Sequence, residues 1–352
     1  MKKILILSDS FCGYGAEHIL RWLGNMLCSR GYFVTFCSIF DTEKNPELTE
    51  KASYYQMGFR WWKYGFHYFV KGAMCLRKYY KNEKFDYVIT FHTNPFMMAL
   101  LARLMCDFKL LHSERDNPYN RDTLATKLKM WLYRFADIIV FQTTGAKAFF
   151  SNKVQSKSSV IPNPVAIPDY KWQGFGKKTL VNVGRLNVRF KRQDLLLQAF
   201  SKITNDYPDY IMKFYGDGKD LAFLQGLAKE LGISDKVMFL GKVNDVNDHL
   251  KNEEIFILSS DSEGMPNALM EAMALGMPVI STDCEPGGAR ALIMNGKDGL
   301  LVERSSVGGL VDAMKKLFNK EVEQKEMGAA ARNKMKLFIP ERVFQQWEDI
   351  LI

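Results

Sequence analysis

The chain of 352 residues is 47% hydrophobic and 25% charged, which suits two globular domains and argues against a largely disordered protein. Its six cysteines are scattered, with no CxxC pair and no histidine at ligand spacing, which argues against a zinc site or disulfide framework and favours a reducing compartment. No apolar run reaches the ~18 residues of a membrane span, and the run after Met1 is too short for a secretory signal, so we expect a cytoplasmic protein.

Short apolar, β-branched runs alternate with stretches of helical period along the whole chain. The predicted strands are Lys3–Leu7, Phe33–Ser38, Tyr87–Phe91, Lys109–His112, Ile138–Phe141 and Ser159–Ile161, then Thr179–Val183, Ile211–Tyr215, Val237–Leu240, Ile255–Leu258, Val279–Ser281 and Gly299–Val302. The predicted helices between them include Ala16–Ser29, Pro95–Met105, Gln193–Thr204, Leu221–Leu231, Asn267–Leu275 and Val307–Phe318. Such alternation is typical of βαβ units, and it predicts an α/β architecture with parallel sheets.

The two series of strands are separated by a proline-rich segment. Three prolines fall within residues 161–168, a density that neither a helix nor a central strand accepts. We therefore predict two doubly wound, Rossmann-like domains facing a central cleft, with ligands at the carboxyl ends of the strands. The expected parts are an N-terminal domain 1–162, a linker 163–177, a C-terminal domain 178–338 and a last helix 339–352, which could pack back on the N-terminal domain.

The positive charge is concentrated in the first half of the chain. Residues 1–170 carry 23 lysines and arginines against 14 acids, whereas residues 171–352 carry 25 of each. Residues 60–84 alone hold seven basic residues, many aromatics and one helical apolar face, made of Trp62, Phe66, Phe69, Ala73, Leu76 and Tyr80. That face predicts a crossover helix packed on a sheet. The Trp, Tyr and Lys residues outside it favour contact with an anionic membrane; nucleic acid would compete, but no nucleic-acid-binding module is present.

The segment 255–281 carries the most chemistry. A buried strand leads into a polar loop, a helix, a Gly-Met-Pro break and a second buried strand. Pro266 suits the start of the helix, where the unpaired amides around Gly264–Asn267 favour anionic or hydroxyl acceptors. Glu263 lies in the loop and Glu271 two turns into an otherwise apolar helix, where an unexposed carboxylate needs a partner.

The spacing Glu263-x7-Glu271, within EGMPNALMEAMALGMPVISTDC, resembles glycosyltransferase family 4, the retaining enzymes of GT-B fold. The resemblance implies that Glu263 contacts the hexose of a nucleotide-sugar donor and that Glu271 binds the ribose hydroxyls. It also implies that the donor pocket is lined by the backbone of Gly264, Met265 and Pro266 and by Asn267 at the helix start.

Further segments of the second half resemble the same family. Arg185 and Lys191 match the pair that neutralises the donor diphosphate, although their loop is one residue longer, so Arg189 or Arg192 could share the role. The resemblance also places Gly216 in a donor-binding turn, and Gly241 and Val243 where the base, expected to be uracil, is held.

In the first half, residues 10–18 resemble the family's GGAE loop, with the role of its glycines shared between Gly13 and Gly15. The strand end around residues 112–118 resembles a segment of enzymes that build bacterial surface polysaccharides. Many relatives contact the donor sugar there through a histidine. The candidates for this contact, or for contacts with the acceptor, are Glu114, Arg115, His92 and His112; for His112 a buried structural role is the stronger alternative.

Together these features predict a retaining hexosyltransferase with Glu263, Arg185 and Lys191 as its catalytic residues. We expect no cofactor and no metal, because no DxD-type pair stands in a plausible site. The donor would be a UDP-linked hexose or N-acetylhexosamine, and the acceptor a lipid-linked saccharide of capsule, O-antigen or exopolysaccharide synthesis at the inner face of the cytoplasmic membrane. The alternatives are a sugar-nucleotide epimerase or other GT-B enzyme, and a non-catalytic sugar-nucleotide-binding subunit.

Overall fold

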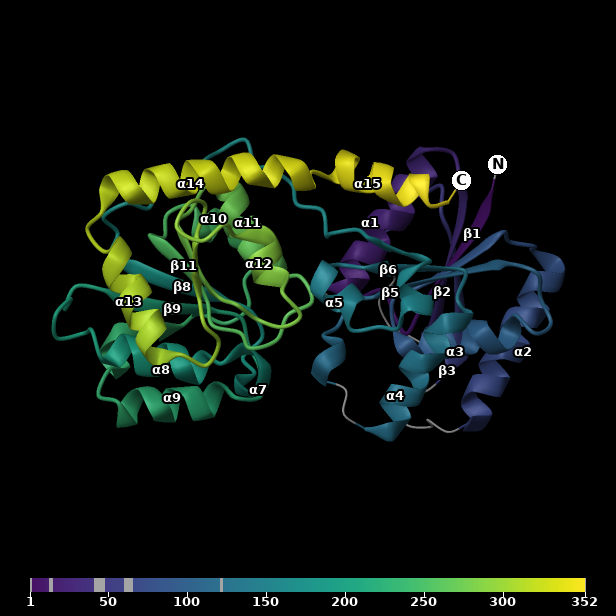
Figure 1. The fold of residues 1–352 in the computed structure, drawn as a ribbon, viewed down its shortest axis with the longest axis horizontal. Helices are drawn as coiled ribbons and strands as arrows, with labels where there is room; N and C mark the ends of the chain where they lie inside the picture. Colours follow the sequence, from purple (N-terminus) through teal and green to yellow (C-terminus); the bar gives the residue numbers. More distant parts are fainter. Residues whose placement is uncertain (1, 13–14, 41–47, 60–65, 121–122, 352) are drawn as a thin grey trace. The chain divides into compact units, whose positions relative to one another are not determined.

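The computed structural model describes residues 2–12, 15–40, 48–59, 66–120 and 123–351. The chain forms two compact units, one of residues 1–162 with 344–352 and one of residues 163–343 (Figure 1). Each unit contains one sheet in which all neighbouring strands are parallel. The predicted α/β class with two Rossmann-like sheets is confirmed.

The first unit has a seven-stranded sheet of order β3-β2-β1-β4-β5-β6-β7. Its strands are β1 (Lys3–Ser8), β2 (Phe33–Phe40), β3 (Ser53–Phe59), β4 (Tyr87–Thr90), β5 (Lys109–Glu114), β6 (Ile138–Phe141) and β7 (Ser158–Val160). Its helices are α1 (Ala16–Ser29), α2 (Phe66–Asn82), α3 (Thr93–Ala102), α4 (Leu124–Trp131), α5 (Thr144–Ala148) and α6 (Asn152–Gln155), with short 3₁₀ turns at Pro118–Asn120 and Leu132–Phe135. The strand order reverses between β1 and β4, which is the topological switch point of this sheet.

The second unit has a six-stranded sheet of order β10-β9-β8-β11-β12-β13. Its strands are β8 (Thr179–Val183), β9 (Ile211–Tyr215), β10 (Val237–Phe239), β11 (Ile255–Leu258), β12 (Val279–Thr282) and β13 (Leu300–Val302). Its helices are α7 (Val188–Lys191), α8 (Gln193–Ser201), α9 (Leu221–Glu230), α10 (Val246–Leu250), α11 (Asn267–Leu275), α12 (Gly288–Leu292), α13 (Val307–Leu317) and α14 (Glu321–Met335), with 3₁₀ turns at Ser234–Lys236 and Lys336–Phe338. Helices α8, α9 and α13 pack on one face and α11 and α12 on the other, so the sheet is doubly wound (Figure 1).

The sequence pattern finds the central elements better than the edges. The predicted bounds of α1, α11, β8, β9 and β11 agree with the structure at both ends. Strand β3 is not predicted, because its sequence SYYQMGF is polar and aromatic and its residues are mostly half-buried at the edge of the sheet. The predicted amphipathic helix corresponds to α2, whereas Trp62 and the start of the basic stretch lie outside the described residues.

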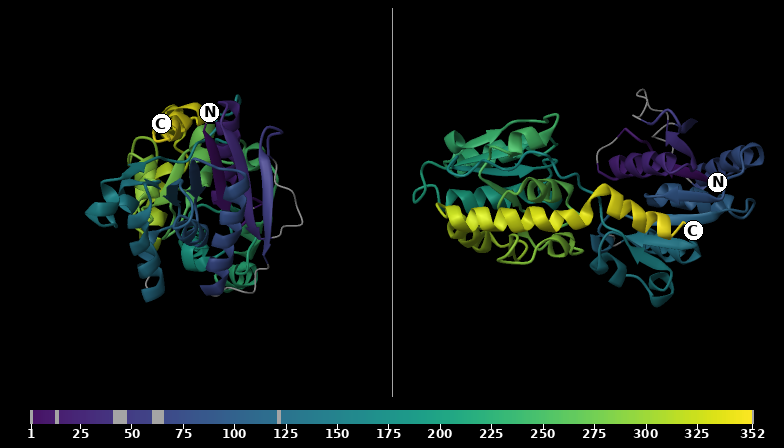
Figure 2. Two further views of the ribbon diagram at one scale, coloured as in Figure 1. Left: turned by 90° about the vertical axis from the view of Figure 1, so that its right-hand side faces the viewer. Right: turned by 90° about the horizontal axis from the view of Figure 1, so that it is seen from above.

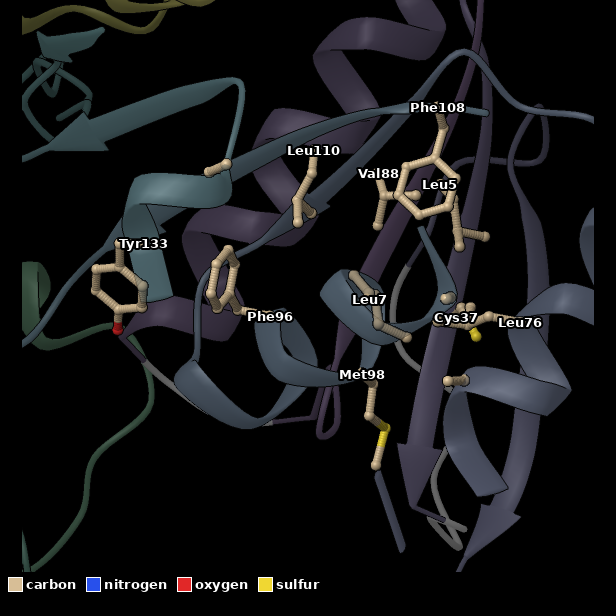
Figure 3. Packing of buried hydrophobic residues seen from close by; sticks show 14 of the residues in the cluster. Leu5, Leu7, Cys37, Leu76, Val88, Phe96, Met98, Phe108, Leu110 and Tyr133 are labelled. Carbon is tan, nitrogen blue, oxygen red and sulfur yellow. The ribbon is translucent and has the colours of Figure 1, made fainter. Parts of the chain in front are cut away.

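The core of the first unit lies between its sheet and the helices α2 to α6. Figure 3 shows Leu5 and Leu7 of β1 pointing into it, with Val88 of the adjacent strand β4 and Leu110 of the next strand, β5. On the opposite face, α1 lies close to the sheet at Gly24, where an added Cβ would stand 2.1 Å from the Phe36 ring. Only glycine allows this approach.

The last helix, α15 (Pro340–Asp349), follows α14 toward the C-terminus in the yellow segment of Figure 2. Its residues from 344 onward belong to the first unit, where Trp347 is fully buried and stacks on Phe91 with 5.9 Å between ring centroids. Residues 163–177, for which we expected a linker, belong to the second unit, and the Val165 amide donates to the Phe338 carbonyl at 2.9 Å. Among the described residues we find no helix with the length and apolar character that crossing a bilayer requires.

The close approach of α1 gives a stability prediction. Gly24→Ala should lower the free energy of unfolding by about 1–3 kcal/mol, because Phe36 is buried and cannot move away. Gly226→Ala in α9 is the matched control: nothing lies within 4 Å of its Cβ, so it should raise stability by about 0.5–1 kcal/mol. Urea unfolding of the two variants measures both values. Equal effects of the two substitutions would contradict this packing.

Candidate functional site

Several predicted residues of the second unit lie at the carboxyl ends of its strands, and the turns that carry them are packed backbone to backbone. An added Cβ at Gly216 would stand 2.1 Å from the Gly184 carbonyl oxygen, so the turns after β8 and β9 touch through glycine. The Gly216 amide donates to the Gly241 carbonyl at 2.7 Å, which fixes the start of the segment leading to Val243. These contacts hold the turns after β8, β9 and β10 against one another beside Arg185.

The basic turn after β8 is held by side chains around it. Asn187 caps the short helix α7 by accepting from the Arg189 amide at 3.2 Å, and the Asp220 carboxylate accepts from the Val188 amide at 2.9 Å. Buried Gln193 donates to the Arg185 carbonyl at 3.0 Å. The exposed side chain of Arg185 forms no ion pair within the described ranges, so its charge is available to a ligand.

Lys191 and Glu263 form an ion pair between the turn after β8 and the loop after β11. The side chains are 28% and 13% exposed, so water screens the pair only in part. Glu263 Oε1 also accepts from the Ser260 hydroxyl at 2.7 Å. The Ser259 hydroxyl donates to the Lys191 carbonyl at 2.8 Å, so that both ends of the pair are fixed.

Arg192 is neutralised inside this unit. Its guanidinium pairs with Asp261 at 2.6 Å and with Asp194 at 3.2 Å. Arg189 is exposed and lies over the Phe190 ring at 5.1 Å. Of the two residues that could share the role of Arg185 and Lys191, only Arg189 therefore has an uncommitted charge among the described residues.

The loop before α11 is shaped by a glycine on a neighbouring helix. An added Cβ at Gly288 would stand 2.6 Å from the Gly264 carbonyl oxygen and 2.9 Å from Pro266 Cδ. Pro266 is the residue that precedes α11, one position earlier than the first-turn place we expected. Sequence reasoning missed Asn163, a buried residue whose amide side chain donates to Asn267 Oδ1 at 2.6 Å and whose backbone amide donates to Met265 Sδ at 3.1 Å.

Glu271 is half-buried and lies about one turn into α11, which begins at Asn267. Desolvation raises its pKa to about 7, and the negative charge of Asp245 adds to the effect. Within the described ranges no donor hydrogen-bonds to this carboxylate. A partly desolvated carboxylate without a hydrogen-bond donor is suited to a ligand that supplies hydroxyl donors.

In the first unit, the predicted residues take different places. Gly15 precedes α1 with φ of 83°, and space is open beside it, whereas Gly13 lies outside the described residues. His112 is fully buried: its Nδ1 lies 3.0 Å from the Thr90 hydroxyl, and its ring packs against Phe96 and Tyr133. These surroundings fit a role for His112 in packing rather than in ligand binding.

Glu114 and Arg115 are also buried. Glu114 accepts from the Tyr133 hydroxyl at 2.8 Å and from the Asp116 amide at 3.1 Å. The Arg115 guanidinium lies 4.1 Å from the Phe91 ring centroid and 5.5 Å from that of Trp347 in the C-terminal helix. Both side chains thus take part in packing, while half-buried His92 sits at the start of α3.

The part of the chain that the structure describes contains no group of three or more His, Cys, Asp or Glu residues arranged to hold a metal ion.

Comparisons with known proteins match both halves of the chain. The family model "Glycosyltransferase Family 4" matches residues 14–167, and the model "Glycosyl transferases group 1" matches residues 173–334. An uncharacterized glycosyltransferase of Haemophilus influenzae is 28% identical over the full length of both chains.

Two further proteins are similar over nearly their whole length. One is the Campylobacter jejuni enzyme named GalNAc-alpha-(1->4)-GalNAc-alpha-(1->3)-diNAcBac-PP-undecaprenol alpha-1,4-N-acetyl-D-galactosaminyltransferase, 27% identical over 99% of this chain and 97% of that one. The other is the structure of Anabaena HepE in complex with UDP and glucose, with a TM-score of 0.82 and 17% identity, covering 100% of this chain and 99% of that one.

The desolvation of Glu271 predicts that its ionised carboxylate lowers the free energy of unfolding. Its raised pKa means that the folded protein loses stability as pH rises from 4.5 to about 7. Glu271→Gln should therefore be more stable than the wild type by roughly 3 kcal/mol at pH 8, and the difference should vanish below pH 4. Urea unfolding across this pH range measures it, with Glu230→Gln on the exposed face of α9 as the control. A pH-independent difference would contradict the assignment.

Proposed function

We propose that this chain, which belongs to the family 4 glycosyltransferases of GT-B fold, transfers a hexose or N-acetylhexosamine from a UDP-sugar to a lipid-linked saccharide. The transfer retains the configuration at the anomeric carbon. The coarser role, a glycosyltransferase of bacterial surface polysaccharide synthesis, follows from the comparisons. The observation that carries the finer proposal is the ion pair of Lys191 and Glu263, which joins the turn after β8 to the loop after β11. Arg185 lies on the first of these segments and Glu271 in the helix that follows the second.

In this proposal the cations bind the diphosphate of the donor. Arg185 offers an exposed guanidinium, and Lys191 leaves Glu263 to meet the phosphate. Two positive charges stabilise the negative charge that develops on the leaving diphosphate, a task that a transferase without a metal ion must give to side chains.

The carboxylates then bind the two ends of the donor. Glu263, released from Lys191, accepts hydrogen bonds from hydroxyls of the sugar, and Glu271 accepts from the ribose diol. Charge-assisted hydrogen bonds of this kind offset the desolvation that raises the pKa of Glu271. The base is placed along Gly241 to Val243, whose start is fixed by the Gly216 contact.

Transfer proceeds on one face of the sugar. The bond from C1 to the diphosphate breaks, the acceptor oxygen bonds to C1 from the same face, and the acceptor proton passes to the departing diphosphate oxygen. No carboxylate nucleophile and no metal ion is required. The residues of the site position the donor and stabilise its leaving group.

An anionic membrane surface is proposed to hold the enzyme near its acceptor. Helices α2 and α3, with the turn after α3, border an apolar hollow of about 190 Å³, lined by Val70, Ala73, Met74, Leu101, Leu104 and Met105. Met74 and Leu104 are exposed, and Lys71, Lys78 and Lys81 of α2 are exposed as well. Exposed apolar side chains beside lysines fit the interface of an anionic bilayer.

Donor binding tests the site directly. Lys191→Gln should weaken UDP binding about tenfold or more, because one charge on the diphosphate is lost. Glu263→Gln should leave UDP affinity equal or higher, since Lys191 is released, yet reduce sugar transfer about 100-fold or more. Isothermal titration with UDP and assays of UDP release from UDP-sugars measure the two effects, with Lys202→Gln on the surface as control. Absence of UDP binding to the wild-type protein would refute the proposed donor site.

Membrane binding is tested by flotation with phosphatidylglycerol vesicles. Replacing Lys71, Lys78 and Lys81 by glutamine should reduce the partition coefficient by about two orders of magnitude at low salt, because each lysine contributes about 1 kcal/mol near an anionic surface. Lys202, Lys219 and Lys229 of the second unit, replaced in the same way, form the matched control. Wild-type protein that fails to float at low salt would overturn this part of the proposal.

A further inference from the structure

Two polar residues lie just beyond the ends of β1 and β4, at the switch point of the first sheet. Strands β1 and β4 pair in parallel with Leu7 opposite Thr90. Asp9 is the first residue after β1 and His92 the second after β4, and the two are close enough for the charge of His92 to act on the Asp9 carboxyl group. Neighbouring strands lie about 4.8 Å apart, so the segments that continue β1 and β4 start close together. Crevices at such a switch point are where open α/β sheets bind ligands.

Both side chains have a buried polar atom that lacks a hydrogen bond. Within the described part of the chain, neither Asp9 Oδ1 nor His92 Nδ1 has a partner. Both residues are only half-buried as a whole, so the other side of each group is open to a ligand. Since buried polar atoms in folded proteins are rarely left unpaired, two such atoms in neighbouring positions call for an explanation.

The electrostatics of Asp9 agree with this geometry. Burial raises the pKa of its carboxyl group to about 6; the charge of His92 opposes the rise, and Glu17 of α1 adds to it. The donor chemistry proposed above uses neither Asp9 nor His92. The other candidates in this unit are committed to packing: His112 to Thr90, Glu114 to Tyr133, and Arg115 to Trp347.

We propose that Asp9 and His92 form a carboxylate–imidazole pair that binds and orients the acceptor sugar. His92 Nδ1–H donates to Asp9 Oδ1, which leaves Nε2 as the acceptor of a hydrogen bond from a sugar hydroxyl. A carboxylate behind an imidazole fixes its tautomer and its orientation. Such bonds are often unformed without substrate and tighten in the complex. The inference rests on the proposed sugar transfer.

The pair is a positioning device, because the acceptor proton still passes to the diphosphate. The ligand class is a saccharide whose hydroxyl donates to an imidazole nitrogen.

The first test separates transfer from donor hydrolysis. Release of UDP is measured from UDP-glucose, UDP-galactose, UDP-N-acetylglucosamine and UDP-N-acetylgalactosamine, with and without the octyl glycosides of the same four sugars. Asp9→Asn and His92→Gln should each lower the acceptor-dependent rate at least about tenfold and leave acceptor-independent hydrolysis within about twofold. The control His67→Gln, on the exposed face of α2, should change neither rate. Equal loss of both rates, or no loss of the acceptor-dependent rate, would overturn the pairing with the acceptor.

The second test works without turnover and so remains decisive if the proposed donor is wrong. The chain has five histidines, and nitrogen-15 NMR of labelled histidine, assigned with His92→Gln, reports the tautomer of each ring. The neutral His92 ring should be the Nδ1–H tautomer, and Asp9→Asn should abolish that preference. An Nε2–H tautomer that Asp9→Asn leaves unchanged would refute the pair. Failure of UDP to bind, with the tautomer as expected, would refute only the proposed donor chemistry.

Discussion

The ion pair of Lys191 and Glu263 is the interaction on which the proposed donor site depends. It joins the turn after β8 to the loop after β11, and Ser259 and Ser260 fix its two ends. The pair keeps a cation and a carboxylate at the strand ends and satisfies both while no ligand is present. When a donor binds, its diphosphate replaces Glu263 as the anion beside Lys191, and its sugar hydroxyls replace Lys191 as hydrogen-bond donors to Glu263. Opening the ion pair therefore leaves neither charge without a partner.

Elsewhere the chain keeps carboxylates without such partners. Glu271 in the second unit and Asp9 in the first are both desolvated, and the pKa of each is raised, to about 7 and about 6. Both lie where polar ligands are expected, one near a helix start and one at a topological switch point. Residues that cost stability at such places are the usual mark of a binding site, because the ligand supplies the missing interactions.

Much of this architecture could be predicted from the sequence, and the exceptions have physical causes. Strand β11 and helix α11 were predictable because an apolar run, Pro266 and Gly276 mark their limits. Strand β3 has no such pattern, because an edge strand buries little of its surface. Asp9 belongs to no motif, and only the pairing of β1 with β4 brings it near His92 in the fold. Asn163 lies in a proline-rich segment, where no pattern predicts its contacts with Met265 and Asn267.

A crystal structure of the complex with UDP tests the central claim most directly. The account predicts that Lys191 Nζ leaves Glu263 and lies within hydrogen-bond distance of the diphosphate, while the ribose hydroxyls donate to the Glu271 carboxylate. A bound UDP that leaves the pair of Lys191 and Glu263 intact, or that makes no contact with Glu271, would contradict it.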